Sequence, residues 1–90
     1  MNKRLHLKIY GRVQGVGFRW SAAKQARVLG LYGWVRNCEE GCVETAVEGD
    51  EGAMEKYRVW CKKGPMFAKV ESMEEEWGEY TGVHATFEMR

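Results

Sequence analysis

The 90-residue sequence predicts an α+β sandwich whose strands and helices follow the order β-α-β-β-α-β-β. Three observations indicate this class. Polar and apolar residues alternate near both ends of the chain, two segments carry apolar residues at helical spacing, and glycine-containing turns separate the segments. Two strand–helix–strand units around a hairpin place both helices on one face of the sheet.

The first half of the chain predicts a strand, a helix and a hairpin. Residues 5–10 alternate between apolar and polar side chains, as in a strand with one buried face. Residues 19–29 carry alanine and leucine at helical spacing, and a glycine follows at the expected C-cap. Residues 33–38 (GWVRNC) and 42–48 (CVETAVE) predict two strands, joined by an EEG turn whose glycine supplies a positive φ.

The second half predicts another helix and two strands. Asp50 is a suitable N-cap for the helix, which ends at the stop signal KKGP, residues 62–65. Residues 67–77 predict a strand with a bulge or a twist, because their alternation is imperfect, and residues 83–89 predict a last strand. The complete pattern is a ferredoxin-like split βαβ sandwich, βαββαβ plus a short extra C-terminal strand, with two helices on one face of a mainly antiparallel sheet.

Length and charge limit the domain organisation and the partners. Ninety residues fit a single domain spanning 1–90. The net charge of +1 gives no field that would attract nucleic acid or an anionic membrane. No apolar run approaches the roughly 20 residues of a membrane span. We therefore expect a cytoplasmic monomer with no nucleic-acid or membrane partner.

The cysteines and histidines indicate neither a metal site nor a nucleophile. An odd number of cysteines without a CxxC pair is typical of a reduced cytosolic protein; the three are Cys38, Cys42 and Cys61. Cys38 and Cys42 flank the predicted hairpin turn, which leaves a local disulfide open. His6 and His84 fall on the polar side of their strands, and no cluster has metal-ligand spacing. We expect no metal and no cofactor.

A glycine-rich segment, GRVQGVGFR (residues 11–19), separates the first strand from the first helix. Its backbone N–H groups and those of the first helical turn can converge on an anion, and the guanidinium of Arg19 suits phosphate oxygens. Trp20 and Phe18 exclude a dinucleotide fingerprint and a Walker loop, which need glycine and lysine there. The pattern alone leaves open whether the segment is an anion cradle or a tight turn.

The segment GRVQGVGFR, followed by GWVRN (33–37) and GCVE (41–44), resembles the acylphosphatase family. The family pattern is G-x-V-Q-G-V-x-F-R, a helix, G-x-V-x-N, and a glycine turn before V-E. The Gly64-Pro65 pair and the closing FEMR (87–90) are also similar to the family, so the resemblance covers essentially the whole chain.

The resemblance implies a hydrolase that cleaves acyl phosphates to a carboxylate and inorganic phosphate, with phosphate as product and inhibitor. It implies no metal, no cofactor and no phospho-enzyme. Arg19 would clamp the phosphate, and Asn37 would hold the attacking water. The loop residues whose backbone N–H groups would wrap the phosphate are Arg12, Val13, Gln14, Gly15, Val16, Gly17 and Phe18.

The alternative is a non-catalytic ferredoxin-like binding module. Tyr10 and Trp34 could present aromatic rings to single-stranded RNA, although the chain lacks the RNP1 signature. A related alternative is an accessory acylphosphatase-like domain of a larger enzyme. Trp20, beside Arg19, is a candidate either for packing or for the mouth of the site.

Overall fold

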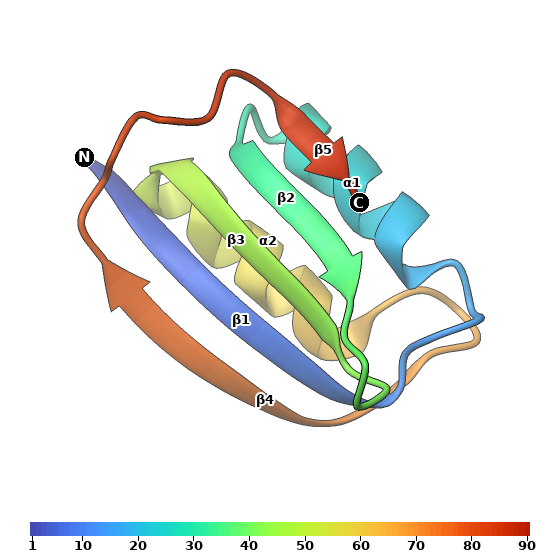
Figure 1. Ribbon diagram of the computed structural model, residues 1–90. Helices are drawn as coiled ribbons and strands as arrows, with labels where there is room; N and C mark the ends of the chain where they lie inside the picture. The colour runs from blue at the N-terminus through green and yellow to red at the C-terminus, as the bar shows by residue number, and fades with distance from the viewer.

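The computed structural model describes residues 1–90 and consists of two helices on one face of a five-stranded sheet (Figure 1). The sheet has the strand order β4-β1-β3-β2-β5, and only the β2–β5 pair is parallel. This arrangement confirms the predicted ferredoxin-like α+β sandwich with a mainly antiparallel sheet. The elements are β1 (Asn2–Arg12), α1 (Phe18–Val28), β2 (Tyr32–Asn37), β3 (Val43–Asp50), α2 (Glu51–Lys63), β4 (Lys69–Gly78) and β5 (Phe87–Met89).

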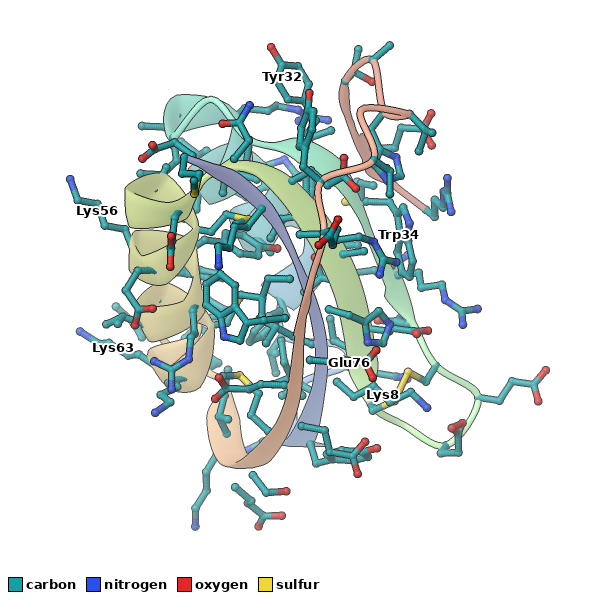
Figure 2. All side chains as sticks on the ribbon, turned by 90° about the vertical axis from the view of Figure 1, so that its left-hand side faces the viewer. Lys8, Tyr32, Trp34, Lys56, Lys63 and Glu76 are labelled. Atoms are coloured by element: carbon teal, nitrogen blue, oxygen red, sulfur yellow. A yellow bond between two sulfur atoms is a disulfide. The ribbon has the colours of Figure 1, made fainter.

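The core lies between the sheet and the two helices. Leu5, Leu7 and Ile9 of β1 are fully buried, which confirms the alternation predicted for this strand. The opposite face of the sheet is open, and Figure 2 shows Lys8 and Trp34 on that side while Lys56 and Lys63 project from α2. Neither helix is long and apolar enough to cross a membrane.

The second helix has the ends that the sequence predicts. The Asp50 side chain accepts a hydrogen bond from the Ala53 N–H at 3.2 Å, and Asp50 is the N-cap of α2. Gly64, at φ 72°, is its C-cap. Helix α1 begins at Phe18 and ends at Val28, one residue earlier at each end than predicted.

The predicted bulge is present in β4, next to Gly11 of β1. Tyr10 pairs with Ser72 and Gly11 with Val70, so Glu71 is an extra residue in β4. Gly11 has φ 125°, and a Cβ there would lie 2.2 Å from the Lys69 carbonyl oxygen. Only glycine therefore allows the two backbones to approach this closely.

The last strand is shorter than its sequence pattern predicts. Only Phe87–Met89 pairs with β2, and residues 79–86 cross from β4 at one edge of the sheet toward β5 at the other (Figure 1). The buried Glu48 carboxylate holds this connection by accepting hydrogen bonds from the Thr81 N–H (3.1 Å), the Thr81 hydroxyl (2.6 Å) and the Gly82 N–H (2.9 Å). A side chain thus satisfies backbone groups that a longer strand would pair.

The Glu48 carboxylate makes the stability of this connection depend on pH. Burial alone would raise the pKa of Glu48, but the hydrogen bonds from Thr81 and Gly82 outweigh burial and lower that pKa. A carboxyl with a depressed folded-state pKa stabilises the fold above its unfolded-state pKa, about 4.3, and loses that contribution as pH falls through the folded-state pKa.

We therefore expect Glu48→Gln to lower the free energy of unfolding by about 1–3 kcal/mol at pH 7. The difference from the wild type should shrink when the same comparison is made at pH 3, because the wild-type carboxylate is then being protonated. Urea denaturation at the two pH values measures both effects. An equal difference at pH 7 and pH 3 would show that the charge of Glu48 is not what stabilises the connection.

Candidate active site

The glycine-rich loop between β1 and α1 is shaped by positive φ angles and not by crowding. Gly15 and Gly17 have φ 73° and 77°, and Gly17 is the left-handed N-cap of α1. A Cβ at either position would meet no atom within 4 Å. These glycines therefore set the direction of backbone N–H groups on an open surface, as an anion-binding loop requires.

The loop forms one wall of a small pocket that also receives side chains from three other segments. The cavity has a volume of about 210 Å³. It brings together Arg19, near the start of α1, and Asn37, the last residue of β2, which the sequence predicts as the catalytic pair. The residues that line it are Val13, Gly15, Gly17, Phe18, Arg19, Trp20, Asn37 and Met89.

The remaining predicted phosphate-loop residues do not line this pocket. Arg12 is the exposed last residue of β1, and Val16 packs against the hydrophobic core. The Gln14 side chain turns toward the β2–β3 hairpin, where its amide donates hydrogen bonds to the carbonyl oxygens of Cys38 and Cys42. Any phosphate contact made by these three residues would have to come from the backbone.

The strand β5 positions the Arg19 side chain. Arg19 Nη1 donates a hydrogen bond to the main-chain oxygen of Arg90, the residue after β5, at 2.8 Å. The Arg90 N–H donates to the Val35 carbonyl oxygen at 2.8 Å. Met89 lines the pocket from the same strand. Sequence reasoning missed both contributions, because no local pattern indicates that residues 89 and 90 return to the loop.

The pocket has a positive electrostatic environment. The first turn of α1 contains no acidic residue, so the positive end of the helix dipole and the guanidinium of Arg19 both face the loop region. Trp20 is 63% exposed and lines the pocket, which favours the site-mouth interpretation over packing. The arrangement suits a small anion held by N–H donors and a guanidinium.

The two hairpin cysteines are oxidised, whereas the sequence predicted a reduced protein. Cys38 and Cys42 form a disulfide, which decides the alternative that their spacing left open. Cys61 is free and buried in the core, as predicted. The disulfide begins at Cys38, the residue directly after Asn37, although neither cysteine lines the pocket.

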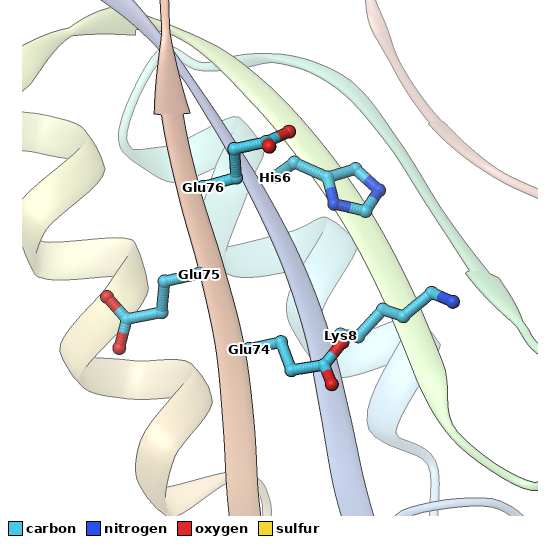
Figure 3. A pocket seen from close by; sticks show the side chains of 5 residues that line it. All are labelled: His6, Lys8, Glu74, Glu75 and Glu76. Carbon is cyan, nitrogen blue, oxygen red and sulfur yellow. The ribbon is translucent and has the colours of Figure 1, made fainter.

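A second cavity, on the open face of the sheet, is lined by His6, Lys8, Glu74, Glu75 and Glu76 (Figure 3). His6 is not a simple solvent-facing residue: its Nε2 lies 2.6 Å from Glu44 Oε2. Glu74 and Glu76 point to this face, whereas Glu75 points toward α2 and pairs with Arg58. The two carboxylates make the cavity unfavourable for phosphate. No group of three or more His, Cys, Asp or Glu side chains is arranged to hold a metal ion.

A family model, the curated relatives and two of the solved structures point to the same family. The acylphosphatase family model matches residues 5–89. The chain is 51% identical to the acylphosphatase of Thermococcus kodakarensis over 80 residues, which are 89% of this chain and 88% of that protein. It is 48% identical to an acylphosphatase of a Roseiflexus species over 84 residues, 93% and 90% of the two chains. The crystal structure of acylphosphatase from Bacillus subtilis superposes with a TM-score of 0.94 at 33% identity, covering 100% and 99% of the two chains.

A pair of glycine substitutions tests whether the loop binds phosphate, separately from the effect of a positive φ on stability. We expect Gly15→Ala to lower the free energy of unfolding by roughly 1 kcal/mol, because φ is positive, and to weaken the binding of inorganic phosphate. Gly30→Ala is the matched control, since Gly30 has φ 72°, open space for a Cβ, and no place in the pocket. Denaturation and isothermal titration with phosphate measure the two effects. Equal phosphate affinities for the two variants would contradict the loop's role.

Proposed function

The chain belongs to the acylphosphatase family, and on this premise we propose that it hydrolyses acyl phosphates to a carboxylate and inorganic phosphate. The family match and the fold both support acylphosphatase activity. The observation that supports it best is the single pocket shared by the glycine loop, Arg19 and Asn37.

In the proposed mechanism the loop and Arg19 bind the phosphoryl group. Backbone N–H groups around Gly15 and Gly17 donate to the phosphate oxygens, and the Arg19 guanidinium donates from the side. Phosphoryl transfer asks the protein mainly for positioning and charge stabilisation, which these donors supply. The Arg90 carbonyl oxygen fixes one nitrogen of Arg19, so the guanidinium is oriented before the substrate arrives.

Asn37 is proposed to hold the attacking water. A neutral amide can both donate and accept hydrogen bonds, so it can orient a water molecule without acting as a base. The leaving group is a carboxylate, which is a weak base and needs no general acid. The phosphate dianion of the substrate can take the proton that the water loses. Neither histidine lines the pocket, and the mechanism uses neither.

Substitution of the two proposed catalytic residues tests this division of roles. We expect Asn37→Ala to lower kcat by about 10²–10³ without changing the Ki of inorganic phosphate, because only water positioning is lost. Arg19→Ala should lower kcat and also raise that Ki. Phosphate release from acetyl phosphate measures both, and Asn2→Ala, an exposed amide outside the pocket, is the control. An Arg19→Ala protein as active as the wild type would contradict the mechanism.

We further propose that hydrolysis needs no metal ion, because the loop donors and Arg19 supply the positive charge that phosphoryl transfer requires. The rate with acetyl phosphate should be the same with and without EDTA, and phosphate should inhibit competitively in both conditions. Loss of activity in EDTA, restored by a divalent cation, would overturn this part of the proposal. Salt-dependent binding of a single-stranded oligonucleotide with no phosphate release would instead favour the RNA-binding module.

A further inference from the structure

The β2–β3 hairpin that follows Asn37 is closed both covalently and by hydrogen bonds. The Cys38–Cys42 disulfide joins the two ends of the turn, whose Cα atoms are 5.0 Å apart. The Cys38 N–H donates to the Cys42 carbonyl oxygen at 2.8 Å, and the Gly41 N–H donates to the Cys38 carbonyl oxygen at 3.2 Å. The separation of the two cysteine carbonyls is therefore tightly limited.

Both carbonyls also accept a hydrogen bond from Gln14 of the phosphate loop. Gln14 Nε2 lies 2.9 Å from the Cys38 oxygen and 2.8 Å from the Cys42 oxygen. Because both partners are carbonyl oxygens, only the NH₂ group of the amide can face them, and each of its two hydrogens is used. Gln14 thus contacts both ends of the turn at once, which requires the two ends to keep their spacing.

This contact lies in a region largely shielded from water. Cys38 is 8% exposed and Cys42 is 1% exposed, and Gln14 is half-buried. Losing either hydrogen bond would remove a partner from a carbonyl that water cannot easily reach. The disulfide and Gln14 therefore form one brace, here called the hairpin brace, between the phosphate loop and the residue after Asn37.

We propose that the hairpin brace positions Asn37 relative to the phosphate loop, so that reducing the Cys38–Cys42 disulfide slows hydrolysis while leaving phosphate binding intact. The inference rests on the proposed function, because it concerns the water that Asn37 is proposed to hold. Gly17 is fixed as the N-cap of α1, and Arg19 is held by its hydrogen bond to the Arg90 main-chain oxygen, so neither contact involves the hairpin. The reduced hairpin can move Asn37 without moving those groups.

A small dithiol such as dithiothreitol is the reductant of the Cys38–Cys42 disulfide. Its thiolate attacks one sulfur of the Cys38–Cys42 bond and releases the other cysteine as a thiolate. The second thiol of the reagent then displaces the first cysteine and closes a cyclic disulfide. Two electrons and two protons pass from the dithiol to the two cysteines. Cys61 is already a thiol and does not change.

The test compares oxidised and reduced wild-type protein. Thiol titration of the denatured protein should rise from one thiol to three, since Cys61 is free and the chain has three cysteines. We expect kcat with acetyl phosphate to fall by about ten- to a hundredfold on reduction, as for a small misplacement of a reacting group. The Ki of inorganic phosphate should stay unchanged. The double variant Cys38→Ser/Cys42→Ser should match the reduced wild type and not respond to dithiol.

Gln14→Leu keeps much of the side-chain volume and removes both donors. It should lower kcat in the oxidised protein. The same substitution should have a smaller effect in the Cys38→Ser/Cys42→Ser background, because the effects of substitutions that disrupt the same contact do not add. Gln25→Leu is the control, since Gln25 is a half-buried amide of α1 outside the pocket. This control should leave kcat unchanged in both backgrounds. Thermal unfolding of each variant confirms that the folded protein is compared.

The outcomes separate this inference from the proposed function. Equal kcat for oxidised and reduced protein, with three thiols titrated, overturns the hairpin brace and leaves the proposed function standing. A rise in phosphate Ki that matches the fall in kcat also overturns it, because the whole pocket would then have changed. Absence of phosphate release from the oxidised protein overturns both.

Discussion

The antiparallel register of β3 against its two neighbours is the constraint on which the pocket depends. Val43 lies opposite Ile9 of β1 on one side and opposite Asn37 of β2 on the other. The carboxyl ends of β1 and β2, and with them the glycine loop and Asn37, therefore lie at the same end of the sheet. A slip of one residue would turn Glu44 and Glu48 toward the helices and Val43 away from the core, so the hydrophobic pattern of β3 holds the register.

The segment between β4 and β5 links the open face of the sheet to the Arg19 guanidinium. Glu48 holds Thr81 and Gly82, and the connection that they belong to leads into β5. The backbone at the end of β5 accepts the hydrogen bond of Arg19. The segment that the Glu48 carboxylate holds on the open face of the sheet thus leads to the backbone that Arg19 contacts at the pocket.

The sequence predicts what local periodicity and caps control, and it misses what distant contacts control. The alternation of β1, the ends of α2 and the bulge of β4 are all local signals, and the structure has all three. Residues 83–86 alternate as cleanly as a strand, yet hydrogen bonds to Glu48 take the neighbouring backbone out of the sheet. For the site, the sequence pattern suggests an anion-binding loop with Arg19 as its cation but leaves a tight turn open. Only the family resemblance points to Asn37 and to acyl phosphates.

The glycines show how the structure refines that reasoning. At Gly11 and Gly33 a Cβ would lie about 2 Å from a backbone oxygen, so close packing requires glycine there. At Gly15 and Gly17 a Cβ would meet nothing, so crowding cannot explain them and the positive φ must. A near-neutral protein can then favour a small anion, because its N–H groups, helix dipole and Arg19 gather at the pocket while Glu74 and Glu76 lie on the open sheet face. Local charge and backbone direction, more than the net charge of +1, make this pocket suited to a small anion.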